Sequence, residues 1–577
     1  MTTDTTELDD IGKHPTYISN ARMGEILVTY YKHVGGGVVS FDPLFTVSVG
    51  GVQCSISCEV GMWDEVQEGT RHPYAKMHRL CNAMDKALIE GGAVLPTFRW
   101  RPHQIGEGER LWDMIDREGW GMLRHMPRTG KTGTLLYALE HSSEPMKVLI
   151  VTTKNAVKGI KGAEGGWVGF VKLAQESGWC MKHSYAVSTP HRVGKHTSGA
   201  YDLVVMDESH KIYSDPKPVP SAMWGMTRMV IADAKVVFVT ATPHAQSINQ
   251  LYWQLSLCKY NPFLVSGIGG WGEYFSKFGK PYTIIIGNGV AIPQYDKGDI
   301  DGIYALCGRG ILSLSQEEVG FSEELLPVDV PHYIEITGTT RLLMDKYKLE
   351  EVVALNDVMV HTMNSRDVEI RLHQMEGGTL KYVDVFSIVD ESTGLRRRGV
   401  KPVEHNWILP TLDKVKYIKD TWGDTSDMVI MYNYVNEGKL LRREFKNAKV
   451  YQGKTHSEGI DLWQYKHLII YAMDWSVATY VQRRDRQVSL GNRKEGIEVH
   501  YLLTKGGVSE DIYKSVVERG ESLTYGFYGK DSTMGSTKVE GSKERVQSEQ
   551  CTTPLSSSHR SAVRSNQRVL PTVKLGS

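Results

Sequence analysis

The sequence predicts an α/β protein built on two parallel β-sheets covered by helices. Six short apolar segments carry this prediction, in two groups of three: 147–153, 201–208 and 235–242, then 427–434, 467–474 and 497–504. Segments that are apolar at nearly every position are typical of strands buried on both faces, as in parallel sheets. The mixed region between the groups, from about residue 245 to 415, is interpreted as an insertion between two domains.

Length and composition indicate a soluble globular protein. The 577 residues suffice for three or four domains, and 41% hydrophobic and 23% charged residues are ordinary values. Lys+Arg and Asp+Glu both total 67, so a polyanion would have to bind at local groups of basic residues. The polar N-terminus does not resemble a signal peptide, and no segment reaches the ~18 apolar residues of a membrane span. We therefore expect a cytoplasmic protein without a membrane partner.

The seven scattered cysteines favour a reducing compartment over a disulfide framework. Cys54, Cys58 and Cys81, with His72 and His78 between them, resemble a metal cluster. Their spacing fits no common zinc site, so buried free thiols are the favoured interpretation.

Residues 1–95 are predicted to form a small N-terminal domain. Segment 21–60 is rich in β-branched and aromatic residues between glycine clusters, which predicts a β-rich unit. Segment 74–90 has apolar residues at helical spacing, and Gly91-Gly92 ends that helix.

Three further divisions follow along the chain. Residues 96–330 are predicted to hold the first α/β domain and the start of the insertion, and residues 331–530 its end and the second α/β domain. Residues 531–577 contain no Phe, Trp or Tyr and are rich in Ser, Thr and Gln, which predicts a disordered tail.

The segment "HMPRTGKTGTLL" (125–136) predicts a phosphate-binding loop between a short strand and a helix that begins near Lys131. Backbone N–H groups at such a helix start bind phosphate, aided by the helix dipole. Lys131 would reach the β- and γ-phosphates, and the Thr132 hydroxyl would ligate Mg²⁺. His125 stands where the common form of this loop has a glycine.

Two predicted strands end in residues suited to nucleotide hydrolysis. "LVVMDESH" delivers Asp207 and Glu208 at the carboxyl end of a strand, where open α/β sheets bind ligands. Asp207 would hold Mg²⁺ through water, and Glu208 would act as general base toward the attacking water. The strand 235–242 ends in Thr240 and Thr242, whose hydroxyls are predicted to bond to the "DESH" segment.

These segments resemble a known family. "RPHQ" (101–104), "MPRTGKT" (126–132), "DESH" (207–210) and "TATPH" (240–244) follow the order of motifs Q, I, II and III of superfamily 2 DExH-box helicases. Within that superfamily the chain looks most like Swi/Snf-type translocases and their bacteriophage relatives, whose phosphate loop often lacks the first glycine.

The resemblance implies two RecA-like domains with ATP and Mg²⁺ as cofactors. It assigns adenine recognition to Gln104, phosphate binding to Thr129, Gly130, Lys131 and Thr132, and coupling between motifs to His210, Thr240 and Thr242. A phage-encoded protein would act in the host cell cytoplasm.

The second domain is similar to motifs V and VI. In "GIDL", Gly459 and Asp461 are implied to contact nucleotide, and Gln482 and Arg486 keep the Gln-to-Arg spacing of motif VI. The sequence departs from the pattern at Ser489, where the family has the arginine finger that contacts the γ-phosphate. Arg486 is the preferred replacement, and the alternatives are Arg483, Arg484 and Arg493.

Nucleic acid is expected to contact basic residues outside the nucleotide site. Lys154 and Lys158 follow a predicted strand in the family's motif Ia region. Arg396, Arg397 and Arg398 form a basic hairpin tip in the insertion, for which a solubilising turn is an equally good interpretation.

The sequence therefore predicts an ATP-dependent DNA helicase or translocase that hydrolyses ATP between two RecA-like domains. Its partners would be single-stranded or duplex DNA, with RNA as an alternative, together with replication or recombination proteins. One alternative is a duplex translocase that remodels complexes without separating strands. Another, suggested by Ser489, is a nucleic-acid-binding scaffold with a degenerate ATPase. The intact Lys131, Thr132, Asp207 and Glu208 favour an enzyme.

Overall fold

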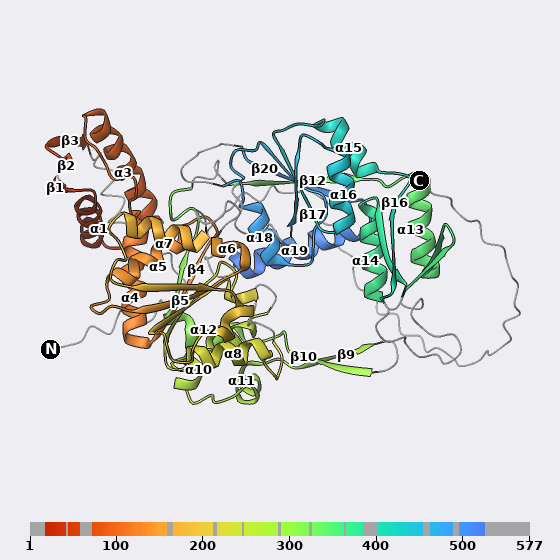
Figure 1. Ribbon diagram of the computed structural model, residues 1–577, viewed down its shortest axis with the longest axis horizontal. Coiled ribbons are helices and arrows are strands. Elements are labelled where there is room, and N and C mark those ends of the chain that lie inside the picture. Colours follow the sequence, from red (N-terminus) through yellow and green to blue (C-terminus); the bar gives the residue numbers. More distant parts are fainter. Residues whose placement is uncertain are drawn as a thin grey trace, which may run out of the picture.

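Two parallel sheets organise the protein, and a smaller unit stands at the N-terminal end (Figure 1). The computed structural model describes the following residues: 18–41, 44–57, 72–158, 166–211, 216–244, 247–286, 290–321, 326–362, 365–384, 401–453, 462–488 and 496–525. The predicted tail, 531–577, lies outside them.

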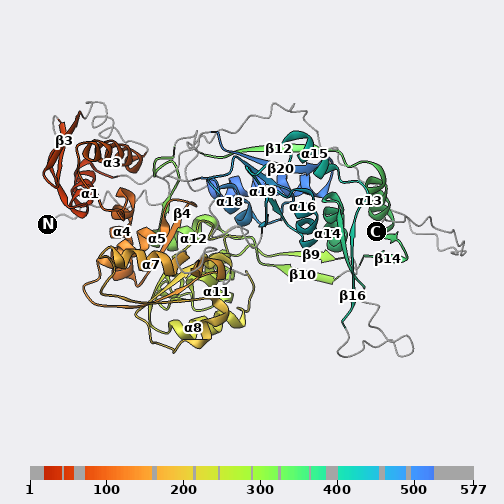
Figure 2. The same ribbon diagram turned by 45° about the horizontal axis from the view of Figure 1, so that its top comes forward.

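The N-terminal unit, residues 18–95, combines a three-stranded antiparallel sheet with two helices: α1 (Asn20–His33), β1 (Gly36–Ser40), β2 (Leu44–Val49), β3 (Val52–Ser57) and α3 (Pro73–Glu90). The predicted helix over 74–90 and its end at Gly91 are confirmed. Figure 2 shows this unit at one end of the molecule, next to the first α/β domain.

The prediction of β-structure is wrong for the first part of segment 21–60, because residues 20–33 form helix α1. The Ser19 hydroxyl caps the helix by accepting a hydrogen bond from the Arg22 N–H at 3.3 Å. Buried side chains recur three and four residues apart along the helix: Met23, Ile26, Leu27, Tyr30 and Tyr31. Burial of these apolar side chains along one face of a helix therefore outweighs the β-propensity of Val28, Thr29 and the two tyrosines.

The first α/β domain is a six-stranded parallel sheet with strand order β11-β4-β8-β7-β5-β6. Its elements are α4 (Pro102–Glu118), β4 (Trp120–His125), α5 (Lys131–Glu140), β5 (Lys147–Val151), α6 (Lys154–Lys158), α7 (Gly166–Glu176), β6 (Ser184–Ser188), η2 (Pro190–Lys195), β7 (Leu203–Asp207), η3 (Ser209–Lys211), α8 (Ala222–Ile231), β8 (Lys235–Val239), α9 (Gln250–Leu255), α10 (Pro262–Val265), α11 (Trp271–Phe278), β9 (Tyr282–Ile286), β10 (Val290–Gln294), α12 (Ile300–Cys307), η4 (Gly308–Gly310) and β11 (Ile311–Leu314).

This sheet is buried on both faces, as its apolar strands predict. In β5, Val148 and Ile150 face one hydrophobic core, whereas Leu149 and Val151 face the other. The first core continues into the N-terminal unit through Leu27, Met77 and their neighbours. The N-terminal unit and the first α/β domain therefore share one hydrophobic core.

The second α/β domain is a five-stranded parallel sheet with strand order β12-β20-β19-β17-β18. Its elements are β12 (Val328–Ile334), α13 (Gly338–Glu350), β13 (Val352–Leu355), β14 (Val358–His361), α14 (Ser365–Glu376), β15 (Thr379–Asp384), β16 (Val403–Ile408), α15 (Asp413–Thr421), β17 (Met428–Tyr432), α16 (Val435–Glu444), β18 (Lys449–Gln452), β19 (His467–Ile470), α18 (Val477–Arg484), β20 (Glu498–Thr504) and α19 (Val508–Tyr525). The two sheets correspond to the two RecA-like domains, and all six predicted strand segments lie in them.

The region 245–415 is not a single insertion between the domains. Strand β11 returns to the edge of the first sheet, and β12 begins the second sheet at its edge. Edge strands have one neighbour and are half exposed, and β12 contains Pro331, so neither shows the continuous apolar pattern of a central strand. The other elements of this region belong to different domains. Helices α9 to α12 pack on the first sheet, whereas the elements from α13 to β16 form a hydrophobic core of their own beside the second sheet.

The described residues contain neither a candidate membrane span nor a candidate metal cluster. None of the described helices combines the length and apolar character that a bilayer span requires. No group of three or more His, Cys, Asp or Glu side chains able to hold a metal ion gathers among the described residues, and Cys58 lies outside them.

The packing of α1 predicts a contrast between two adjacent residues. Leu27 is fully buried and Val28 is 44% exposed. We expect Leu27→Ala to lower the free energy of local opening of α1 by about 2–5 kcal/mol, because it leaves a cavity in the shared core. Val28→Ala is the matched control and should change it by less than about 0.5 kcal/mol. Hydrogen exchange of the α1 amides measures both, and equal effects would contradict the helical packing.

Candidate nucleotide site

The predicted phosphate loop lies between β4 and α5. Gly130 has φ +83°, a left-handed conformation that favours glycine, and α5 begins at the next residue. The Lys131 ammonium donates to the carbonyls of His125 at 3.0 Å and Met126 at 3.1 Å. Burial lowers the pKa of Lys131, and the carboxylates of Glu208 and Asp207 oppose that shift. The lysine therefore lies at the loop, close to both acidic residues.

Hydrogen bonds hold the loop from within and from α4. The Thr129 hydroxyl donates to the Met126 carbonyl at 2.8 Å, and the Gln104 amide donates to the Gly130 carbonyl at 3.1 Å. Gln104 also accepts from the Arg101 N–H at 2.9 Å. A Cβ at Gly133 would overlap the Gln104 amide, so a larger residue there would displace the Gln104 side chain. Gln104 thus supports the phosphate loop in this structure, and its reading of adenine stays a prediction.

His125 lies in the core behind the loop. Its ring is fully buried, with Nε2 3.7 Å from the Glu107 carboxylate of α4. Burial lowers the pKa of His125, although Glu107 opposes the shift. The residue at the position of the missing glycine is thus a packing residue of the first domain, directed toward α4.

Asp207, at the end of β7, is held by two donors. The Thr152 hydroxyl and the Trp167 indole N–H both donate to Oδ2, at 2.6 and 2.7 Å. Burial raises the pKa of Asp207 to about 6, with a further contribution from Glu208. The sequence analysis did not predict that Trp167 contacts Asp207. The available signal was the position of this tryptophan soon after the predicted motif Ia region.

The donor set fits Mg²⁺. The ion prefers oxygen ligands, and the Thr132 hydroxyl and the Asp207 carboxylate supply them near the phosphate loop. Both hydrogen bonds to Asp207 engage Oδ2. The other oxygen, Oδ1, receives no hydrogen bond from the described residues, which suits it to a metal-bound water.

Glu208 lies where the two α/β domains meet. Its φ is +51°, and its N–H donates to the Val239 carbonyl at 2.8 Å, so β8 holds the turn after β7. From the second domain, the Gln482 amide donates to Glu208 Oε2 at 3.2 Å. Gln482 Oε1 in turn accepts from the Lys211 ammonium at 3.2 Å. Motif II and the predicted motif VI glutamine are therefore in direct contact.

The predicted coupling residues also meet. His210 Nδ1 lies 2.7 Å from the Thr240 hydroxyl and 3.4 Å from Glu208 Oε2. The Thr242 N–H donates to the Thr240 hydroxyl at 3.1 Å. The prediction for the Thr242 hydroxyl is wrong, because this buried hydroxyl forms no hydrogen bond with the "DESH" segment or with any other described residue. Burial lowers the pKa of His210 to about 3, so the ring is neutral and bonds β7 to β8 without adding charge.

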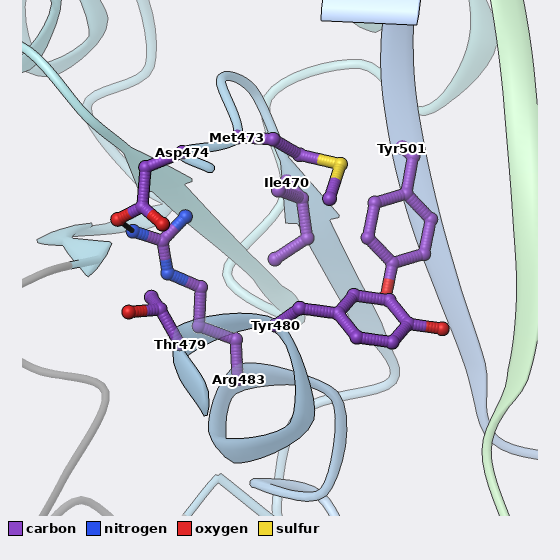
Figure 3. A pocket seen from close by; sticks show the side chains of 7 residues that line it. All are labelled: Ile470, Met473, Asp474, Thr479, Tyr480, Arg483 and Tyr501. Carbon is purple, nitrogen blue, oxygen red and sulfur yellow. Dashed lines mark ion pairs between the residues drawn. The ribbon is translucent and has the colours of Figure 1, made fainter. Parts of the chain in front are cut away.

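The candidate arginines of α18 differ in their surroundings. Arg483 points into the second domain, where it donates to the Ala472 carbonyl and pairs with Asp474 at 3.6 Å in a small pocket (Figure 3). Arg484 pairs with Asp329 of β12 at 2.9 Å. Arg486 donates to the Gln482 carbonyl at 3.0 Å, and its charge contributes to lowering the pKa of Lys131. The positive charge of Arg486 therefore acts on the lysine of the phosphate loop.

A second arginine, missed by sequence reasoning, joins the loop to the other domain. Arg128 has φ +68° and donates to the carbonyls of Arg486 at 3.0 Å and Asp485 at 3.4 Å. The Gln316 side-chain amide connects the same loop and turn, because it donates to the Pro127 carbonyl at 3.0 Å and to Asp485 Oδ2 at 3.1 Å. The phosphate loop thus contacts the turn that carries Arg486.

Of the remaining predicted site residues, the structure describes two, both of them lysines. Lys154 and Lys158 lie exposed on α6, just after β5. The others lie outside the described residues: Arg396, Arg397, Arg398, Gly459, Asp461, Ser489 and Arg493.

Part of the first domain is similar to a known protein family. Residues 123–250, from β4 into α9, match the family described as the Flavivirus DEAD domain. This match supports a superfamily 2 helicase-like fold. No curated protein sequence matches the chain.

Two solved structures from Sulfolobus solfataricus match more of the chain. The SWI2/SNF2 ATPase core in complex with dsDNA is 14% identical, over 75% of this chain and 94% of that one, with a TM-score of 0.31. The SWI2/SNF2 ATPase core domain is also 14% identical, over 74% and 90%, with the same TM-score of 0.31.

The hydrogen bonds to Asp207 predict a role for Trp167 in metal affinity. Trp167→Phe keeps an aromatic ring in the core but removes the N–H donor. Loss of such an outer hydrogen bond typically weakens metal binding 10–100-fold, so we expect the Mg²⁺ concentration for half-maximal nucleotide binding to rise roughly tenfold. Anisotropy of a fluorescent ATP analogue during Mg²⁺ titration measures it.

Trp179→Phe is the control, because Trp179 packs against Trp100 and His33 in the same core, whereas the indole that donates to Asp207 is that of Trp167. An unchanged Mg²⁺ dependence in Trp167→Phe would show that the indole N–H does not support the metal site.

Proposed function

We propose that this protein is a nucleic-acid-dependent ATPase that moves along DNA as a helicase or translocase. The hydrogen bond between Gln482 and Glu208 carries the proposal. It joins the predicted catalytic carboxylate of one RecA-like domain to the predicted motif VI of the other. ATP would therefore bind at a place where a movement of one domain relative to the other changes the contacts of the catalytic carboxylate. The helicase-like fold of the first domain supports it.

The residues have separate roles in this proposal. Backbone N–H groups of Thr129 to Thr132 and the Lys131 ammonium bind the phosphates, and Gln104 supports the loop. Mg²⁺, when held by Thr132 and Asp207, neutralises charge on the β- and γ-phosphate oxygens. Glu208 accepts a proton from the attacking water and orients it, while Gln482 and His210 position that carboxylate.

Arg486 is proposed as the arginine finger. Arg483 and Arg484 are engaged by Asp474 and Asp329 within the second domain, whereas Arg486 acts on Lys131 across the domain boundary. A cation in this place would stabilise charge on the transferred phosphoryl group. Because the main chain of Arg486 is bonded to Arg128, a shift of the second domain would also reach the phosphate loop.

Nucleic acid is proposed to bind beside the same site. Lys154 and Lys158 lie exposed on α6, and Thr152, two residues before α6, donates to Asp207. Phosphates held by the two lysines would therefore be connected through a short stretch of chain to the metal-binding carboxylate. This connection gives a physical route for nucleic acid to stimulate hydrolysis.

Substitution of the catalytic residues tests the ATPase. In a phosphate-release assay with single-stranded DNA, duplex DNA and RNA, we expect Glu208→Gln to lower turnover by about 10²- to 10⁴-fold. Arg486→Ala should lower it at least about 10³-fold. Arg443→Ala, an exposed arginine of α16 paired with Glu444, is the control and should leave turnover unchanged.

Near-normal turnover in Arg486→Ala would refute the finger assignment. Undetectable hydrolysis by the unmodified protein, with Lys131→Ala binding nucleic acid equally well, would instead support the scaffold. Separation of a forked duplex without displacement of a triplex strand would indicate a helicase. The reverse result would indicate a duplex translocase.

The two lysines of α6 predict a change in salt dependence. Lys154→Ala with Lys158→Ala should weaken nucleic-acid binding equally across sequences. It should also reduce the slope of log affinity against log salt concentration by about one for each phosphate that is no longer neutralised. Affinity measured by fluorescence anisotropy between about 50 and 200 mM salt tests it. An unchanged slope would place the nucleic acid elsewhere.

A further inference from the structure

Helix α3 of the N-terminal unit reaches the phosphate loop through two histidines. His78 of α3 has its Nε2 2.7 Å from Nδ1 of His103, the second residue of α4. His103 Nε2 lies 2.6 Å from the Thr129 carbonyl oxygen in the phosphate loop. His103 is fully buried and His78 is 9% exposed, so both bonds are shielded from water.

The acceptor at the end of this chain determines where the protons lie. A carbonyl oxygen only accepts, so His103 must carry its proton on Nε2 and donate to Thr129. Burial lowers the pKa of His103 well below its ordinary value, so the ring is neutral and Nδ1 is an acceptor. His78 must therefore donate from Nε2. The two donors point in one direction, from the N-terminal unit toward the loop.

A second set of contacts runs in parallel from the same helix. The Tyr74 hydroxyl donates to Glu107 Oε1 at 2.9 Å, and Glu107 Oε2 lies 3.7 Å from His125. His125 ends β4 immediately before the loop, whereas Thr129 lies near the start of α5. Side chains of α3 thus act, through α4, on both ends of the phosphate loop.

We propose that His78 and His103 are positioning residues for the phosphate loop, which makes the N-terminal unit part of the nucleotide site. The bond to the Thr129 carbonyl orients the Thr129–Gly130 peptide, which carries the Gly130 N–H, one of the groups that would meet phosphate. His78 holds the His103 ring in the tautomer and orientation that this bond needs. This role in ATP affinity rests on the proposed function, whereas the support of the loop itself does not.

Substitutions of His78 separate the hydrogen bond from packing. His78→Phe fills the ring volume but has no donor, whereas the side-chain amide of His78→Gln can donate to His103 Nδ1. His33→Phe is the matched control, because His33 belongs to the same N-terminal unit but packs on Trp179 and Tyr137 rather than on His103.

Two measurements on the full-length protein make the test. Without nucleotide, amide hydrogen exchange of residues 126–132 should be roughly three- to tenfold faster in His78→Phe, and unchanged in His78→Gln and His33→Phe. With ATP, the KM of His78→Phe should rise by a similar factor with a smaller change in kcat, since the residue touches no reacting atom.

The outcomes separate this inference from the proposed function. Unchanged loop exchange in His78→Phe, or equal effects in His78→Gln and His78→Phe, would overturn the positioning role. Faster exchange in a protein that hydrolyses no ATP would leave that role standing and refute the ATPase. An unchanged KM for an active His78→Phe variant would overturn the contribution to nucleotide affinity.

Discussion

Two adjacent carboxylates, Asp207 and Glu208, lie at the carboxyl end of β7, where burial disfavours the charged form of Asp207. Charges removed from water must be compensated by hydrogen bonds or opposite charge. The surroundings supply both: Thr152 and Trp167 donate to Asp207, Gln482 donates to Glu208, and Lys131 lies close to both. The architecture of the site follows from this requirement, because each donor comes from a different element.

The same requirement connects parts of the chain that are distant in sequence. Trp167 connects Asp207 to α7, and Gln482 connects Glu208 to the second RecA-like domain. Lys131 of the phosphate loop interacts electrostatically with both carboxylates. The loop in turn depends on α4 through Gln104 and on α3 through His103 and His78. A change in any of these elements alters the balance of charge around Asp207 and Glu208. The proposed ATPase needs this property, since binding at one site must change the properties of another.

Polar side chains form the described hydrogen bonds across the domain boundary, and Val488, just after α18, adds an apolar contact with the first hydrophobic core. Arg128 donates to two main-chain carbonyls, and Gln316 and Gln482 each bond across it. Main-chain acceptors lose little when a domain moves, because water can replace the donor. By contrast, the N-terminal unit shares a continuous hydrophobic core with the first domain. We expect the first domain to move together with the N-terminal unit and relative to the second domain.

The sequence by itself determined the fold class, the six central strands, the placement of Lys131 at a helix start and that of Asp207 and Glu208 at a strand end. These features are local, because apolar runs, a glycine-bearing loop and an acidic strand end can be recognised without knowing their neighbours. The edge strands β11 and β12 could not be predicted in this way, since half-exposed strands lack a continuous apolar pattern. Helix α1 was missed because β-branched and aromatic residues also fit a helix that has a core to pack against.

Only the tertiary structure decided which residues support the site. Trp167 and His78 belong to no recognised motif, and Arg128 and His103 lie within motifs that assigned them no role. Each contributes through a contact with a segment remote in sequence. The four nearby arginines of "QRRDRQVSLGNRK" look alike in the sequence. Arg483 and Arg484 end helix α18 and form ion pairs within the second domain, whereas Arg486 lies in the turn after the helix, where its charge acts on Lys131. Side-chain direction depends on the packed backbone, which residue order alone does not specify.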